Sequence, residues 1–275
     1  MMRGMFAAIS GLKNHQIMLD VTANDIANVN TIGYKSARTT FKDSLTQVQR
    51  GSSGPGTANA GSNAAQIGLG VQLGSIDNLM QSGALQSTGN PLDVAIQGDG
   101  FFRVGLGTPP AVPNTTEFTR AGNFTRNQAG FLATQDGYYV VGRAAPDAVG
   151  DSLIQIPGDA SGVAIGQDGG VSYIPGGGGP RQVAGYLSLA TFANPAGLER
   201  TSGNRWIASA NSGAETTGTP GGTLGVTTAG AIEMSNVDLA QAFTTMITSQ
   251  RGFQANSRII STSDEMLQDL VNLKR

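Results

Sequence analysis

The chain has 275 residues, of which 39% are hydrophobic and only 13% are charged, and its formal net charge is −2. This length is sufficient to bury a hydrophobic core, so a folded protein is expected. The small negative charge argues against a broad basic surface for nucleic acid or anionic lipid, and the absence of cysteine excludes disulfides and thiolate chemistry.

The first predicted element is a long amphipathic helix over residues 2–29. Apolar residues recur there at alternating spacings of three and four, which places them on one face. The helix is expected to end near Asn28 and Asn30, before Gly33, a residue that tolerates a left-handed turn. Residues 1–12 lack the apolar run and cleavage site of a signal peptide, and no apolar stretch reaches the length of a membrane span. Export, if it occurs, is therefore expected without a cleaved signal peptide.

Residues 36–75 predict an extended connector, and the stretch from Gly51 to Gly70 is rich in Gly, Ser, Asn and Ala, with little to bury. Residues 76–234 predict a mostly-β outer domain, because β-branched and aromatic runs alternate there with glycine turns. Trp206 is expected in its core. The predicted strands are 94–96, 101–104, 138–141, 163–165, 171–174 and 186–192, and the predicted tight turns are Asp99-Gly100, Asp136-Gly137 and Asp168-Gly169.

A second long helix is predicted from residue 235 to about Leu273. Ser235 and Asp238 fit a capping box at its start. Its main apolar stripe is interrupted every seventh residue by Gln250, Ser257 and Asp264. This pattern fits a larger helical bundle better than a two-stranded coiled coil.

The two apolar stripes need a partner, because each buried Leu, Ile, Phe or Met side chain contributes about 1.5–3 kcal/mol. We therefore expect residues 1–35 and 235–275 to form a helical polymerisation domain, in which the two ends pair with each other and then with further copies. The fold class is α+β, with a coiled-coil core on assembly. The alternative is that both helices pack on the surface of the β domain. The expected oligomer interface is Met5, Ile9, Leu12, Leu19, Ile26, Leu239, Phe243, Met246, Phe253, Ile260, Leu267 and Val271.

Glycines inside the predicted helices, Gly4, Gly11 and Gly252, indicate either close helix approach or tolerated defects. His15 has no cysteine or carboxylate at metal-ligand spacing and is interpreted as an ordinary helix or interface residue. The glycines at 176–179 lack the Gly-Lys-Ser/Thr ending of a phosphate loop, and turn chemistry explains Asp168. We predict no catalytic residue, no metal and no cofactor, and hence no enzyme.

Residues 19–35 resemble the N-terminal signature of the bacterial flagellar rod and hook (axial) proteins, and residues 234–257 resemble their C-terminal signature. Residues 92–96, 98–102 and 118–124 resemble parts of the family's first β domain, so the likeness spans nearly the whole chain. Asp25 departs from the family, which usually has asparagine there. The residues that match the two signatures are Asn24, Ala27, Asn28, Thr31, Gly33, Tyr34, Lys35, Ser235, Asn236, Val237, Gln250, Arg251, Asn256 and Ser257.

The resemblance implies an inner coiled-coil tube of terminal helices, an outer β layer, and unfolded export through the flagellar type III apparatus to the extracellular flagellum. Residues 250–257 and 267–275 look most similar to the short hook proteins of Gram-positive type, which favours a hook subunit in a curved, torque-transmitting universal joint. The alternative is the distal rod protein, a straight drive shaft, because it has a similar length and a comparable insertion where this chain has Gly51 to Gly70. In the family, that insertion is associated with straight, stiff tubes.

The partners implied by the resemblance are further copies in a helical tube, the distal rod protein, the hook-filament junction protein, the hook cap and the export apparatus. Neither nucleic acid nor insertion into a lipid membrane is implied. A β-rich surface adhesin and a secreted carbohydrate-active enzyme are remote alternatives, because neither needs apolar-striped helices at both ends.

Overall fold

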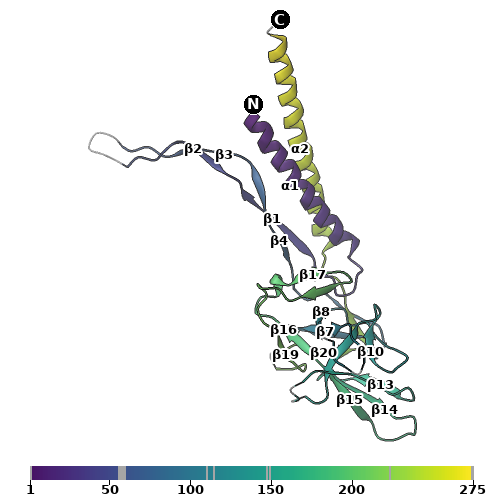
Figure 1. Cartoon of the computed structure of the whole chain (residues 1–275). Helices are drawn as coiled ribbons and strands as arrows, with labels where there is room; N and C mark the ends of the chain where they lie inside the picture. The colour runs from purple at the N-terminus through teal and green to yellow at the C-terminus, as the bar shows by residue number, and fades with distance from the viewer. Residues whose placement is uncertain are drawn as a thin grey trace. The chain divides into compact units, whose positions relative to one another are not determined.

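The structure is a computed structural model, and it describes residues 2–273 with the exception of 55–59, 110, 114, 147, 149 and 223. It confirms the α+β class, with one long helix near each end of the chain and a strand-rich region between them (Figure 1). The chain divides into two compact units. The helical unit comprises Met1–Ala27, Ala37–Asn78 and Asp238–Arg275, and the β unit comprises Asn28–Ser36 and Leu79–Val237.

The elements follow one another along the chain as α1 (Met2–Ala27), β1 (Ala37–Asp43), β2 (Thr46–Arg50), β3 (Ala65–Gly68), β4 (Val71–Asn78), β5 (Leu85–Ser87), β6 (Val94–Gln97), β7 (Phe101–Gly105), β8 (Glu117–Thr119), β9 (Phe124–Arg126), β10 (Leu132–Thr134), β11 (Tyr139–Arg143), β12 (Ser152–Leu153), β13 (Ser161–Ile165), β14 (Gly170–Ile174), β15 (Gln182–Leu187), β16 (Leu189–Thr191), the 3-10 turn η1 (Pro195–Gly197), β17 (Glu199–Thr201), β18 (Arg205–Ile207), β19 (Thr216–Gly218), β20 (Val226–Ala229), β21 (Ala231–Glu233) and α2 (Leu239–Asn272).

The start of α2 differs from the predicted capping box. Asp238 is the N-cap residue, and its carboxylate accepts hydrogen bonds from the amides of Ala240 and Gln241. Ser235 accepts only from Val237 N, because the preceding segment is held extended by backbone bonds such as Met234 N to Ala84 O. The helix therefore begins four residues later than predicted. At the other end of the chain, α1 stops at Ala27, two residues before the predicted end.

The segment predicted as an extended connector forms a two-stranded antiparallel hairpin. β1 pairs with β4, and β2 pairs with β3. Part of the stretch from Gly51 to Gly70 lies outside the described residues, namely 55–59. Few side chains of the hairpin are buried, so the ladder of backbone hydrogen bonds is its main source of order.

The β unit is built on an antiparallel sheet with the strand order β13-β14-β15-β11-β7-β8-β18-β17. Strands β9, β10, β12, β16 and β19 join this sheet beside that path, and the short pairs β6-β20 and β5-β21 stand apart from it. The predicted strand 186–192 is divided at Ser188, because β15 pairs with β14 and β11 whereas β16 pairs with β7 and β19. The glycines of the three predicted Asp-Gly turns all have positive φ.

Two apolar clusters fill the β unit. Trp206 is fully buried, as predicted, and packs in the smaller cluster with Phe101, Phe118 and Phe192. Phe118 and Phe192 meet edge to face at 4.8 Å between ring centroids. The larger cluster contains Val94, Ile96, Phe102, Val104, Phe124, Leu132, Val140, Ile154, Ile156, Ile165, Val171, Leu187, Leu189 and Leu224.

Candidate assembly interface

The two terminal helices pack against each other through small and polar side chains. A Cβ on Gly11 would lie 2.7 Å from Asn256 Nδ2, and one on Gly252 would lie 2.6 Å from the His15 ring. These two glycines therefore permit close approach of antiparallel helices (Figure 1), whereas nothing lies near Gly4. The buried helix residues are Ala8, Gly11, Asn14, Thr22, Asp25, Ser249 and Ser263.

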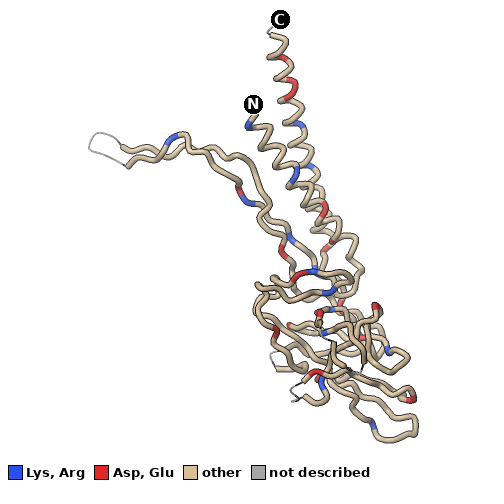
Figure 2. Tube along the Cα trace, viewed as in Figure 1, with Lys and Arg blue, Asp and Glu red and all other residues tan. Residues whose placement is uncertain are grey.

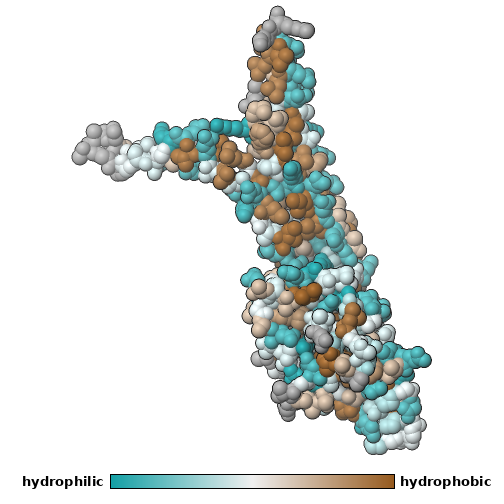
Figure 3. Space-filling model, in the orientation of Figure 1, coloured by the Kyte–Doolittle hydropathy of each residue, from teal (hydrophilic) through white to brown (hydrophobic). Residues whose placement is uncertain are grey.

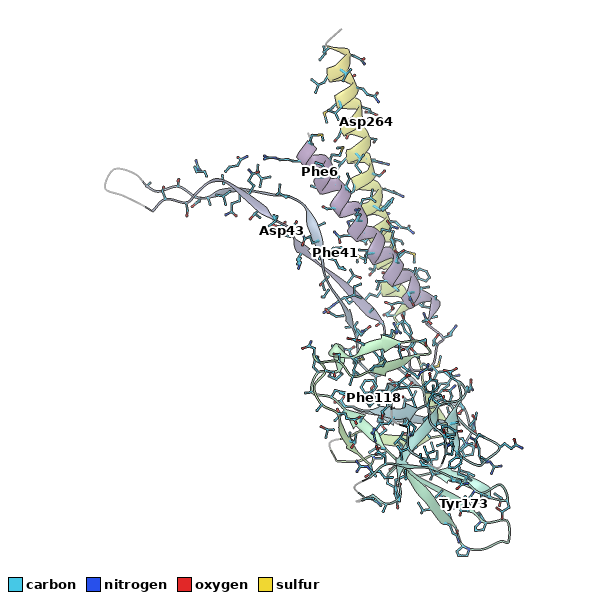
Figure 4. All side chains as sticks on the ribbon, viewed as in Figure 1. Phe6, Phe41, Asp43, Phe118, Tyr173 and Asp264 are labelled. Atoms are coloured by element: carbon cyan, nitrogen blue, oxygen red, sulfur yellow. The ribbon has the colours of Figure 1, made fainter. Side chains whose placement is uncertain are left out.

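The apolar residues of the helices remain accessible. None of the twelve predicted interface residues is buried: Leu239, Phe243 and Val271 are exposed, and the other nine are half-buried. Figure 3 shows hydrophobic residues gathered along the visible face of the helices, and Phe6, labelled in Figure 4, is 60% exposed. Further exposed apolar residues, which the list from the sequence omitted, are Met2, Phe6, Ile247, Ile259, Met266, Leu270 and Leu273. The helices thus pair, but most of their large apolar side chains stay at least partly accessible in the single chain.

The last two turns of α2 extend beyond α1. Because Gly11 faces Asn256 in an antiparallel pair, Met2 lies level with about Glu265. Residues from Met266 onward therefore have no α1 residue at their level, and Val271 and Leu273 are 70% and 83% exposed. Charged residues are sparse on both helices (Figure 2). The exposed apolar residues of this helix end lie beside the acidic residues Asp264, Glu265 and Asp269.

Asp25, the departure from the family signature, connects α1 to the hairpin. Both of its carboxylate oxygens accept from the Ala37 amide, at 3.2 and 3.3 Å, and the side chain is buried. Asparagine at this position would keep one such acceptor. Asp25→Ala is expected to lower the free energy of unfolding by about 1–3 kcal/mol, because the half-buried Ala37 amide loses its acceptor, and Asp25→Asn by much less. Thermal unfolding of the two variants tests this, and equal losses would contradict it.

The two family signatures meet inside the β unit. Asn236 N donates to Tyr34 O at 3.4 Å, and both residues belong to the signatures. On either side of this bond, Gly33 N donates to Glu233 O at 2.8 Å and Ser36 N donates to Asn236 Oδ1 at 2.8 Å. The Asn236 amide group donates in turn to the carbonyls of Leu79 and Gln81. The segment that follows α1 in the chain is thereby fastened beside the segment that precedes α2.

Three charged side chains are buried at this junction. Lys35 Nζ lies 2.6 Å from Glu233 Oε1, and Arg120 lies 3.3 Å from Glu233 Oε2. Lys35 and Glu233 are both fully buried. Burial lowers the pKa of the Lys35 ammonium below its ordinary 10.5, and the Glu233 carboxylate opposes this shift. Sequence reasoning found Lys35 only through the signature and missed Glu233, although a glutamate in the apolar run of β21 was a usable signal.

The other signature residues serve several structural roles. Tyr34 is buried under the Arg200 guanidinium, which lies 4.2 Å from the ring centroid. Thr31 donates to Asn28 Oδ1 in the turn after α1. Asn256 lies against Gly11. Exposed signature residues are Asn24, Ala27, Gln250, Arg251 and Ser257, and half-buried ones include Ser235 and Val237.

No group of three or more His, Asp or Glu side chains in the described part of the chain is placed to hold a metal ion. Neither α1 nor α2, over its described residues, has a stretch apolar and long enough to cross a membrane.

Comparison with known proteins supports the assignment of both signatures to flagellar rod and hook proteins. Residues 5–35 match the family described as flagella basal body rod protein, residues 95–173 the flagellar hook protein FlgE/F/G D1 domain, and residues 228–273 the flagellar basal body rod FlgEFG protein C-terminal region. The flagellar basal-body rod protein FlgG of Bacillus subtilis is 47% identical to this chain, over the whole of both proteins. The chain belongs to the flagellar rod and hook protein family. It is therefore a structural subunit of the flagellum.

Within this family, the relatives favour the rod over the hook. The FlgG protein of Agrobacterium fabrum is 39% identical over 96% of this chain and 97% of its own. The flagellar hook protein FlgE of Borreliella burgdorferi is 28% identical, and its alignment extends over 441 residues, which far exceeds the length of this chain. The comparisons thus support the distal-rod alternative better than the hook interpretation that residues 250–257 and 267–275 suggested.

Proposed function

We propose that this chain is the distal rod protein of the flagellar basal body, a subunit that polymerises into a straight tubular drive shaft. The observation that carries the proposal is the end-to-end match, at 47% identity, to a protein named as a basal-body rod protein. That match runs through the hairpin of residues 37–78 as well as through both helices. A hook function would have rested on the two short C-terminal stretches alone.

The terminal helices are the proposed polymerisation surface. Their contact with each other uses small and polar residues, whereas the apolar residues from Met5 to Val271 remain accessible. Burial of such side chains contributes about 1.5–3 kcal/mol each, so assembly into a helical tube gives them their partner. Residues 1–35 and 235–275 are proposed as the inner layer, residues 36–75 as the arm between the layers, and residues 76–234 as the outer layer.

The proposed partners follow from the place of a distal rod in the flagellum. They are further copies of this chain, the neighbouring axial subunits above and below it, and the flagellar export apparatus. Export without a cleaved signal peptide is part of the proposal. It is supported by the membership of the chain in the flagellar rod and hook family.

Electron cryotomography of a strain that lacks this gene tests the function. We expect basal bodies that end after the proximal rod, with no hook and no filament. Complementation with the intact chain is expected to restore both. A strain with a complete rod but no hook would contradict the rod proposal and would return the chain to the hook class.

A further inference from the structure

The hairpin of the helical unit bends between two halves. The inner half is β1 with β4, and the outer half is β2 with β3. Two backbone bonds continue the ladder through the bend, from Ser44 N to Gly70 O at 2.9 Å and from Leu69 N to Leu45 O at 2.8 Å. Figure 1 shows the outer half diverging from α1 beyond this point, and Figure 4 labels Asp43, where β1 ends. The direction of the outer half is therefore set at the bend.

Two side chains of α1 form hydrogen bonds with the backbone of Val71, next to the bend. Val71 N donates to Ser10 Oγ at 3.2 Å, and Asn14 Nδ2 donates to Val71 O at 2.8 Å. Ser10 and Asn14 are one helical turn apart and lie on the same face of α1. Together they offer Val71 the acceptor and the donor that a neighbouring strand would offer.

Ser10 and Asn14 each make a further hydrogen bond within α1. The Ser10 hydroxyl donates to Ala7 O at 2.8 Å while it accepts from Val71. The second N–H of the Asn14 amide donates to Ser10 O at 2.9 Å, and Asn14 is only 7% exposed. Rotation of either side chain would break two hydrogen bonds that water does not readily replace. The contact between α1 and Val71 is therefore expected to be rigid.

The residue beside Val71 makes the close approach possible. Gly70 has a φ of +118°, and a Cβ there would overlap Ser10 Oγ and lie 3.3 Å from Ala7 Cα. Glycine alone meets both conditions. In the strands of the outer half, every residue of β2 is exposed and Ala65 is the one residue of β3 that is half-buried, so these two strands have no comparable buried anchor.

We propose that Ser10 and Asn14 are positioning residues that lock the outer hairpin at a fixed angle to α1, and that this fixed angle limits bending of the assembled tube. The inference rests on the proposed rod function for its second part only. The outer hairpin can resist bending of an assembly only if its angle to α1 is fixed. Ser10 and Asn14 bond the chain at the bend where this angle is set. Loss of these hydrogen bonds is therefore expected to lower the resistance of the tube to bending. Polymerisation is expected to continue, because the apolar helix faces are unchanged.

The first test measures the angle within a single chain. Spin labels at Gln16 on α1 and Gln47 on β2, both exposed, report the distance distribution between helix and arm by pulsed electron paramagnetic resonance. Asn14→Asp keeps the shape of the side chain but removes both donors and sets a carboxylate against two carbonyls. We expect a broadened distribution. The Val71 amide is also expected to exchange about tenfold faster, because without the Asn14 bond to Val71 O the Val71 backbone can move away from Ser10 Oγ, which accepts from its N–H.

Three further variants keep the result interpretable. Gly70→Ala attacks the same contact from the hairpin side and is expected to act like Asn14→Asp. Ser10→Thr retains the hydroxyl and is expected to keep the narrow distribution. Thr248→Ala is the matched control, because its hydroxyl bonds the carbonyl of Thr244 on an exposed face of α2. A narrow distribution in both Asn14→Asp and Gly70→Ala would overturn the inference.

The second test measures the tube. Electron micrographs of rods isolated from cells that express Asn14→Asp are expected to show curved shafts, whereas Thr248→Ala gives straight ones. Straight shafts built from subunits whose arm has broadened would overturn the link between arm angle and bending. The spin-label result does not depend on which axial structure the chain builds, so failure of the rod proposal in the deletion strain is distinguishable from failure of this inference.

Discussion

Replacing Glu233 with glutamine is expected to lower the free energy of unfolding of the β unit by about 3–5 kcal/mol. Glu233 is fully buried and lies between two buried cations, Lys35 and Arg120. The neutral amide would leave both positive charges without a counter-charge. Chemical denaturation followed by fluorescence of Trp206, which lies in the same unit, measures the change.

The control for this variant is Glu199→Gln, because Glu199 is an exposed glutamate of the same unit. Its free energy of unfolding is expected to change by less than about 0.5 kcal/mol. Equal effects of the two substitutions would contradict the role given to the buried charges.

A triple replacement distinguishes the cost of leaving buried charges unpaired from the cost of removing the ion pairs themselves. With Lys35→Met, Arg120→Leu and Glu233→Leu together, no unpaired ion remains, so much of the stability is expected to return. Recovery is expected to be incomplete, because Glu233 Oε1 also accepts from Gly83 N and Lys35 Nζ donates to Gln81 O. Gly83 N would lose its acceptor, Gly98 O would lose the Arg120 guanidinium, and Gln81 O would keep only the bond from the Asn236 amide.

Phe243→Glu is expected to abolish polymerisation while the isolated chain keeps its fold. Phe243 is 49% exposed in the single chain, so the substitution removes little packing there. In an assembly the glutamate would replace a buried ring by a charge, which is unfavourable by several kcal/mol. The critical concentration for assembly should therefore rise by about 100-fold or more.

Gln241→Glu, in the same first turns of α2 and also exposed, is the matched control. It is expected to polymerise like the unaltered chain. Sedimentation of the assembled material and circular dichroism of the unassembled material give the two readouts. Normal assembly of Phe243→Glu would remove this face of α2 from the proposed interface.

Much of the helical architecture could be predicted from sequence, because it depends on local pattern. The spacing of apolar residues located α1 and α2 within a few residues, and β-branched runs located six strand regions of the β unit. The structure of the connector was harder to predict than that of the helices. Its composition predicted an extended connector, but the ladder between β1 and β4 is made by backbone groups that composition does not record.

The sequence by itself determined which surfaces are apolar and which residues carry the family signatures. The tertiary structure decided which faces the two helices present to each other, because Gly11 and Gly252 admit a closer contact than the bulky apolar residues would allow. It also decided that Lys35, Arg120 and Glu233 share one buried site, although 85 residues separate Lys35 from Arg120 and 113 separate Arg120 from Glu233. Local periodicity carries no information about such separations, since pairing over long distances depends on how the whole chain packs.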